Sequence, residues 1–168
     1  MAEAPGISVR AAQAADAEAI AAIYNHYVAG SIVTFEEQPV TAQQMAQRLD
    51  ETAPLPWLVA ETNGKVAGYA CASRWKGRCA YRYSAESSVY LDHALTGRGI
   101  GSLLYAALID ALHAQGLHVI IGGIALPNDA SVRLHEKFGF RKTAHFEQVG
   151  FKFGRWIDVA YFQLTFAG

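Results

Sequence analysis

The chain has 168 residues, of which 52% are hydrophobic and 17% are charged, and its formal net charge is -1. This length corresponds to about one domain, and the composition is that of an ordinary globular protein rather than a disordered or fibrous one. A nucleic-acid partner is disfavoured, because binding the phosphate backbone needs a clustered basic surface and the sequence contains none.

The cysteine content and the apolar patterning exclude further classes. Cys71 and Cys79 lie in no CxxC or Cys/His spacing, so neither a disulfide framework nor a zinc site is indicated. The N-terminus has no basic segment followed by an apolar run, and no stretch approaches the roughly 18–20 apolar residues of a membrane span. We therefore expect a soluble, cytoplasmic protein with no membrane partner, folded as a single domain over residues 1–168.

The first part of the chain predicts a strand and two helices. Residues 7–10 alternate enough for a short strand, and apolar residues recur at helical spacing over 20–28 before Gly30. Thr41 and Gln44 have the spacing of a capping box, in which each side chain bonds the other residue's backbone N–H, so a second helix begins there.

An antiparallel hairpin follows these helices. Residues 31–40 form a polar loop with one exposed-looking aromatic side chain, Phe35. Residues 57–61 and 66–75 have strand character and flank an Asn-Gly pair at 63–64, which suits the positive φ angles of a two-residue hairpin turn.

The middle of the chain predicts a β-α-β crossover. Residues 81–92 are typical of a long strand, and the apolar period then changes to that of a helix over 100–112, which Gly116 ends. Residues 118–124 form an apolar, partly β-branched run that suits a buried parallel strand.

A short helix and two strands complete the prediction. Asn128 or Asp129 can cap a short helix that contains Val132, Leu134 and Phe138 and stops at Gly139. Residues 140–148 and 156–166 are typical of strands. The expected fold class is α/β with one mixed sheet, antiparallel in its first half and parallel around the crossover.

The sharpest local motif is a glycine-rich turn before the helix at 100–112. Glycines at 97, 99 and 101 let an anion approach the backbone, and the free N–H groups of a helix start, together with Arg98, favour phosphate. The alternative is that the glycines only shape a tight turn. No Lys-Ser/Thr follows as in a P-loop, and the spacing is GxGxG rather than GxGxxG, so another phosphate-bearing cofactor is expected.

This turn, together with Asn128 and the Leu-His-Glu-Lys-Phe-Gly-Phe segment at 134–140, resembles the GNAT superfamily of N-acetyltransferases over nearly the whole chain. Within that superfamily the chain is similar to the phosphinothricin and methionine sulfone–sulfoximine acetyltransferases. The similarity rests on Trp75-Lys76, Arg78, Tyr81, residues 85–90, 127–129 and 131–136, and Gly150-Phe151-Lys152.

The resemblance implies a GNAT-like fold of about seven strands and about four helices, with the sheet splayed between the strands near 86–92 and 118–124. Acetyl-coenzyme A (acetyl-CoA) is the implied co-substrate, with its pantetheine arm along residues 89–91 and its pyrophosphate on residues 98–102, and no metal is implied. The superfamily pattern has Gln or Arg at position 96, where this chain has Thr96. This departure removes a side-chain donor for the cofactor but leaves the backbone donors. The implied cofactor-binding residues are Val89, Tyr90, Leu91, Arg98, Gly99, Ile100, Gly101, Ser102 and Asn128.

Two residues are candidates for proton transfer. Acetyl transfer needs a neutral amine, so a carboxylate at the site can take its proton directly or through water. The resemblance assigns this role to Glu86, whose pKa burial would raise, while the alternative is a salt bridge to Arg82 or Lys76. It also places His135 where many superfamily members have a tyrosine that protonates the departing thiolate, and assistance to the base is the alternative role. A lone histidine on a helix face is more often structural.

Lys76, Arg78 and Tyr81 offer two cations and a hydroxyl for a small anionic amine. The resemblance assigns the phosphinate, sulfone or sulfoximine group of the acceptor to them, and adds Phe35 and Ser88 as lining residues. The alternative is an exposed charge run on a hairpin. Further candidates for the acceptor's carboxylate are Arg74 and Arg82.

The implied function is acetylation of the amino group of phosphinothricin, methionine sulfone or methionine sulfoximine by direct attack on the thioester. The alternatives are another small amine or a protein N-terminus as acceptor, and a non-catalytic sensor that binds acetyl-CoA. A polyamine would need carboxylates rather than cations in the pocket. The family also forms homodimers, and Trp156, Tyr161, Phe162 and Phe166 of the last strand suit either that interface or the core.

Overall fold

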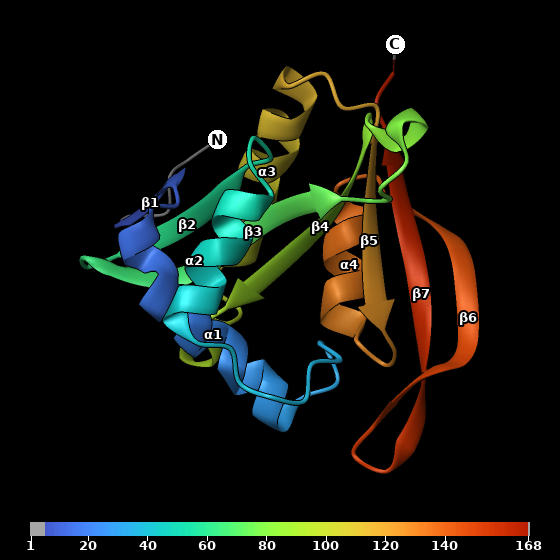
Figure 1. Cartoon of the computed structure of the whole chain (residues 1–168), viewed down its shortest axis with the longest axis horizontal. Coiled ribbons are helices and arrows are strands. Elements are labelled where there is room, and N and C mark those ends of the chain that lie inside the picture. Colours follow the sequence, from blue (N-terminus) through green and yellow to red (C-terminus); the bar gives the residue numbers. More distant parts are fainter. Residues whose placement is uncertain (1–5, 168) are drawn as a thin grey trace.

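The structure, a computed structural model, describes residues 6–167 and is built on one seven-stranded sheet (Figure 1). The strand order is β1-β2-β3-β4-β5-β7-β6. The strands are β1 Ile7–Ala11, β2 Trp57–Thr62, β3 Lys65–Arg74, β4 Ser84–Leu91, β5 Val119–Ala125, β6 Arg141–Lys152 and β7 Arg155–Thr165. The helices are α1 Ala17–Gly30, α2 Ala42–Glu51, α3 Ile100–Ala114 and α4 Asp129–Lys137, with short 3-10 turns at Ala14–Asp16, Cys79–Tyr81 and His93–Leu95.

One pair of neighbouring strands is parallel, and it is joined only at its start. All other neighbours pair antiparallel, whereas β4 and β5 pair in parallel over residues 84–86 and 119–121. Beyond Glu86 the two strands diverge toward their C-terminal ends, as Figure 1 shows. The predicted mixed sheet and its splay are thereby confirmed.

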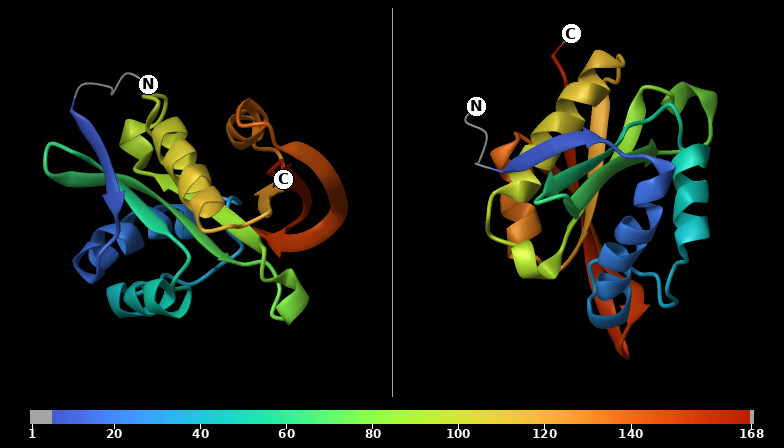
Figure 2. Two further views of the ribbon diagram at one scale, coloured as in Figure 1. Left: turned by 90° about the horizontal axis from the view of Figure 1, so that it is seen from above. Right: turned by 90° about the vertical axis from the view of Figure 1, so that its left-hand side faces the viewer.

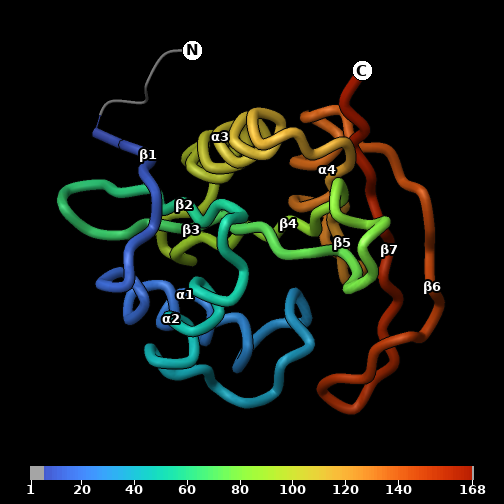
Figure 3. The backbone as a smooth tube through the Cα atoms, turned by 45° about the horizontal axis from the view of Figure 1, so that its top comes forward, coloured from blue at the N-terminus to red at the C-terminus, as the bar shows by residue number. Residues whose placement is uncertain are grey.

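Helices cover both faces of the sheet. Figure 2 and Figure 3 show α3 on one face and α1 with α2 on the other. The apolar face of α3 repeats every four residues, and Ile100, Leu104, Leu108 and Leu112 are at most 1% exposed. Burial of each such side chain contributes roughly 1.5–3 kcal/mol, so this helix fixes the turn that precedes it against the sheet. Met45 of α2 is likewise 1% exposed on the opposite face.

Several local predictions are confirmed in detail. Thr41 and Gln44 form the expected capping box, with N–H to side-chain oxygen distances of 2.9 and 3.1 Å. Asn63 and Gly64 have φ angles of 51° and 72°, as the two-residue hairpin turn requires. Gly116 follows α3 with a φ of 82°, so a left-handed residue ends that helix.

Two expected strand boundaries were wrong. The strand predicted from residue 81 begins at Ser84, because residues 79–81 form a 3-10 turn in which the Arg82 N–H donates to the Cys79 carbonyl (3.1 Å). The strand predicted over 140–148 continues to Lys152 through an irregularity at Gln148, whose φ is 51°. The single domain expected over 1–168 stays a prediction, and its residues 1–5 and 168 lie outside the described part of the chain.

No helix within residues 6–167 is both long and apolar enough to cross a bilayer.

Candidate active site

A first cavity occupies the wedge between the diverging strands β4 and β5. Its volume is about 420 Å³, and its lining includes residues 87–91 of β4, residues 123–125 of β5 and the starts of α3 and α4. Since the pairing of β4 with β5 ends at Glu86, the backbone N–H and C=O groups of residues 87–90 on that side can pair with an extended ligand chain.

The start of α3 supplies this cavity with backbone donors. Gly99 is the N-cap residue, with a φ of 79°, and Gly97 has a φ of 75°, which glycine adopts without strain. No side chain caps α3, whereas Thr41 caps α2 and Asn128 caps α4. The first N–H groups of α3 are therefore free to bind an anion, which the helix dipole also favours.

Most residues expected to bind the cofactor lie at this cavity. Arg98 is exposed and Ile100 is buried in the core, so neither side chain is in the lining that the structure describes. Thr96 does line the cavity, and its hydroxyl donates to the His93 carbonyl (3.3 Å). The expected residues that line it are Val89, Tyr90, Leu91, Gly99, Gly101, Ser102 and Asn128.

Two further side chains act at this cavity and carried no signal of their own in the sequence. Tyr27 of α1 lines it, and its hydroxyl donates to the Leu91 carbonyl (2.5 Å), which anchors the end of β4. The Lys137 ammonium donates to the Ser102 hydroxyl (2.9 Å), which places a cation beside the anion-binding turn. These partners are 64 and 35 positions apart, so no local pattern reveals them.

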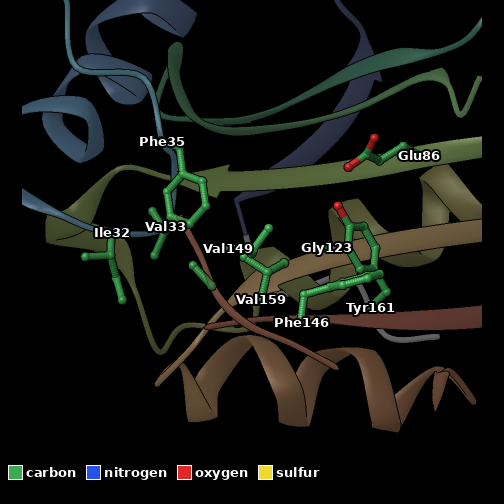
Figure 4. Close-up of a pocket in the computed structure, with 10 residues that line it drawn as sticks. Ile32, Val33, Phe35, Glu86, Gly123, Phe146, Val149, Val159 and Tyr161 are labelled. Carbon is green, nitrogen blue, oxygen red and sulfur yellow. The ribbon is translucent and has the colours of Figure 1, made fainter. Parts of the chain in front are cut away.

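A second cavity, of about 450 Å³, adjoins the first, and the two share Val33, Gly123 and Ala125 in their linings. Figure 4 shows apolar side chains around it, from the loop before α2 and from β6 and β7. Among the residues described at this cavity, Glu86 and Tyr161 have the only polar side chains. A ligand here would meet an apolar wall, one carboxyl group and one phenol beside the first cavity.

Glu86 occupies the last position at which β4 pairs with β5, and it lines the second cavity. Burial raises the pKa of its carboxyl group, and the charge of Lys76 opposes that shift. The expected effect of burial is thus confirmed. No ion pair found within residues 6–167 includes Glu86, and the Arg82 guanidinium instead lies over the Tyr83 ring (4.7 Å to the centroid). The carboxyl group is therefore not held by a salt bridge.

Tyr161 is a cavity residue that sequence reasoning assigned only to a core or interface strand. It pairs with Gly123 of β5, and Figure 4 shows its hydroxyl pointing toward the Glu86 carboxylate. Its ring packs edge-on against Trp75 and Phe146, at centroid distances of 5.5 and 5.7 Å. Burial, and then the charge of Glu86, raise the pKa of Tyr161, so it stays a neutral phenol that can donate a hydrogen bond.

His135 is 5% exposed on α4 and lines the first cavity. Its Nδ1 lies 2.7 Å from the Ser131 carbonyl oxygen, and because a carbonyl only accepts, Nδ1 carries the proton. Nε2, which packs against Gly122 of β5, is then an acceptor in the neutral ring. Burial lowers the pKa of His135, and the Ser131 hydrogen bond opposes that shift.

The residues expected to bind the acceptor are spread over a wider area. Phe35 lines the second cavity, whereas Ser88 lines the first. Arg78 and Tyr81 are exposed on the β3–β4 connection, outside both linings as described. Lys76 is exposed on the same connection, but its charge influences Glu86.

Residues 9–161 match the family model of the acetyltransferase (GNAT) domain. The chain belongs to the GNAT acetyltransferase family. It is 42% identical, over 161 residues covering 95% of this chain and 88% of the relative, to a phosphinothricin N-acetyltransferase of Streptomyces viridochromogenes. It is 40% identical over 160 residues, 94% of each chain, to an L-methionine sulfoximine/L-methionine sulfone acetyltransferase of Salmonella typhimurium. The crystal structure of a phosphinothricin acetyltransferase from Sinorhizobium meliloti in complex with acetyl-CoA is 35% identical, with a TM-score of 0.93 over 96% of this chain and 89% of that one.

The residues of this GNAT acetyltransferase fit acetyl-CoA, which supplies an acetyl group activated as a thioester. The unpaired edge of β4 suits the pantetheine arm, and the uncapped start of α3 with Lys137 suits phosphate. The predicted family, GNAT fold and co-substrate are confirmed. Within residues 6–167, no group of three or more His, Cys, Asp or Glu side chains is placed to hold a metal ion.

Proposed function

We propose that this acetyltransferase acetylates the amino group of a small amino acid of the phosphinothricin, methionine sulfone or methionine sulfoximine class. The first cavity is then the cofactor cavity and the second the acceptor cavity. The proposal is carried by their junction at Val33, Gly123 and Ala125, with Glu86 on the acceptor side. The substrates named for the two relatives support this class of acceptor.

Glu86 is the proposed base, acting on the acceptor's ammonium group directly or through a water molecule. Its raised pKa makes it a stronger base than an exposed glutamate. The neutral Tyr161 hydroxyl points toward the same carboxylate and can hold either that group or an intervening water. The apolar wall to which Phe35 contributes keeps bulk water away from the amine.

His135 is proposed to handle the second proton of the reaction, on the cofactor side. Its Nδ1 proton is bound to the Ser131 carbonyl, so the neutral ring can only accept a proton at Nε2. We infer that His135 first takes up a proton and then returns it toward the departing thiolate. Replacement by asparagine, which keeps a donor for Ser131, should preserve the fold but slow turnover.

The acceptor's anionic group is proposed to bind at the open side of the acceptor cavity. Lys76 is near enough for its charge to oppose the rise that burial causes in the pKa of Glu86. A head group held by Lys76 therefore leaves the amine within reach of the base. Arg78 and Tyr81 lie on the same exposed connection and supply further donors. Ser88 is proposed to act on the cofactor side of the junction.

We also propose a cytoplasmic homodimer. Contiguous exposed apolar side chains mark interaction surfaces. Of the aromatic residues expected at the interface, Trp156 is exposed, whereas Tyr161 lines the acceptor cavity, Phe162 is buried and Phe166 stacks on His113. Sedimentation of Phe151→Glu, compared with the unmodified chain, should show a shift from dimer to monomer mass. The exposed apolar residues at the tip of the β6–β7 hairpin are Val149, Phe151, Phe153 and Trp156.

The decisive experiment is acceptor-dependent release of the coenzyme A thiol with phosphinothricin, methionine sulfone, methionine sulfoximine and spermidine. Release with the first three and not with spermidine is expected. Release only with other amines or with peptide N-termini would replace the proposed class of acceptor. Tight binding of acetyl-CoA without release of the thiol in the presence of any acceptor would favour a non-catalytic sensor of acetyl-CoA.

A further inference from the structure

Lys152, near the end of β6, is a buried cation whose contacts serve a loop rather than a carboxylate. It is 1% exposed, and its ammonium donates to the Ser31 carbonyl (2.7 Å) and the Thr34 carbonyl (2.8 Å). Its remaining side faces the Phe153 ring, 5.0 Å from the centroid. Burial lowers the pKa of Lys152, and the charge of Glu37 opposes that shift. A buried ammonium is unfavourable unless its donors are used, and here two of them bind one loop.

That loop, residues 31–35, forms one wall of the acceptor cavity and is called the acceptor loop below. It follows α1 and contributes Ile32, Val33 and Phe35 to the lining. A further anchor is the hydrogen bond between the Thr34 and Tyr24 hydroxyls (2.7 Å). Because the loop contains no helix or strand, its position depends on such side-chain contacts.

A second residue of β6 docks the same loop from the same face. The Phe35 ring packs directly on Gly150, where an added Cβ would overlap it. Gly150 and Lys152 are two residues apart and both buried, while Phe151 and Phe153 are 54% and 56% exposed. The strand therefore presents one face to the acceptor loop and the other to solvent. This arrangement gives a role to the Gly150-Phe151-Lys152 segment, which the reaction itself does not use.

We propose that Lys152 is a positioning residue that sets acceptor affinity by holding the two carbonyls of the acceptor loop. The ammonium is not in the cavity lining as described, so it acts through the loop and not on the substrate. This inference rests on the proposed function, because acceptor turnover is one of its readouts.

The kinetic test compares Lys152→Met, which keeps length but removes the donors, with Lys152→Arg, which restores them. Losing hydrogen bonds from a charged group should raise the acceptor KM about 10- to 100-fold, with the acetyl-CoA KM unchanged. The arginine variant should recover part of the loss. Lys142→Met is the matched control, since Lys142 lies on the same strand but is exposed and bonded to His145, and it should leave both KM values unchanged.

Hydrogen exchange gives a readout that needs no turnover. In Lys152→Met the amides of residues 31–36 should exchange faster, while those of α2 and β5 stay protected. Gly150→Ala should disturb the same loop through Phe35 with Lys152 intact, so it tests the docking even when the methionine variant folds poorly.

The outcomes separate this inference from the proposed function. An inactive wild-type chain with faster loop exchange in Lys152→Met would reject the acceptors and keep the positioning role. An active chain in which Lys152→Met leaves the acceptor KM unchanged would overturn the positioning role. So would unchanged loop exchange, or an equal rise in both KM values.

Discussion

Replacing Glu86 with glutamine should slow acetyl transfer and leave binding nearly intact. The change keeps the size and polarity of the side chain and breaks no ion pair found in residues 6–167. A positioned general base contributes about 10²- to 10⁴-fold in rate, or roughly 3–5.5 kcal/mol of barrier. We therefore expect kcat to fall by that factor, while the KM values for acceptor and acetyl-CoA change little.

The pH dependence of the same variant gives a sharper test. In the wild-type chain, kcat/KM should fall as the pH drops through the pKa of Glu86, which burial places above its usual range. Glutamine has no such ionisation, so this acidic limb should be missing from its profile. Thiol release measured over a pH series for the wild type and the glutamine variant, after subtracting the titration of the acceptor's own amine, shows whether the acidic limb is present in each.

Stability should change in the opposite direction from activity. Because burial raises the pKa of Glu86, the folded chain binds this proton more tightly than the unfolded chain does. The contribution to stability is complete below the unfolded pKa of about 4.3 and is lost as the pH rises through the folded pKa. At neutral pH the glutamine variant should be at least as stable as the wild type, which thermal unfolding at two pH values will show. Each tenfold difference in proton affinity corresponds to about 1.4 kcal/mol.

Two results would refute this reasoning. A glutamine variant with the wild-type kcat and acidic limb would exclude Glu86 as the base. A variant that is clearly less stable than the wild type at neutral pH would show that the carboxylate stabilises the fold through a contact, and is not merely tolerated there.

Three further substitutions test neighbouring parts of the site. Tyr161→Phe should lower kcat/KM for the acceptor about 10- to 100-fold without affecting acetyl-CoA binding, since it removes a donor that faces Glu86. An unchanged kcat/KM, measured by thiol release, would show that the Tyr161 hydroxyl takes no part in turnover. Thr96→Arg adds a cation at the turn before α3 and should lower the acetyl-CoA KM about two- to fivefold. This factor corresponds to the roughly 0.3–1 kcal/mol by which a charge at a helix terminus acts. A higher KM for acetyl-CoA would contradict the prediction. Gly99→Ala should lower the free energy of unfolding by about 1 kcal/mol in urea titrations, because φ is 79° although no atom lies within 4 Å of the added Cβ. Equal stability would mean that the turn relaxes.

The sequence predicts the elements around the first cavity well because they are local. The apolar spacing of α3, the glycines before it and Asn128 before α4 lie within short segments whose periodicity and capping can be recognised directly. The resemblance to the family then assigns these segments to acetyl-CoA. Glu86 is assigned through the same resemblance, and it lies on β4 just before the residues that line the first cavity.

The acceptor half depends on contacts that no short segment contains. Lys152 meets the carbonyls of Ser31 and Thr34 across 121 and 118 positions. Tyr161 reaches the cavity because β7 pairs beside β5, and a shift of one residue in that register would turn it to the other face. These relationships are set by strand order and register, which apolar patterns alone leave open.

Two consecutive glycines on β5, Gly122 and Gly123, mark the place where other groups approach this strand closely. Glycine inside a strand often marks the close approach of another group. Successive residues of a strand face opposite sides, so Gly122 makes room for the His135 ring on the cofactor side. Gly123 makes room for Tyr161 and Glu86 on the acceptor side, where an added Cβ would lie 3.0 Å from the tyrosine ring and 3.6 Å from the carboxylate. The strand thus has no side chains at positions 122 and 123, and this absence lets groups from α4, β4 and β7 come close to the place where the two cavities meet.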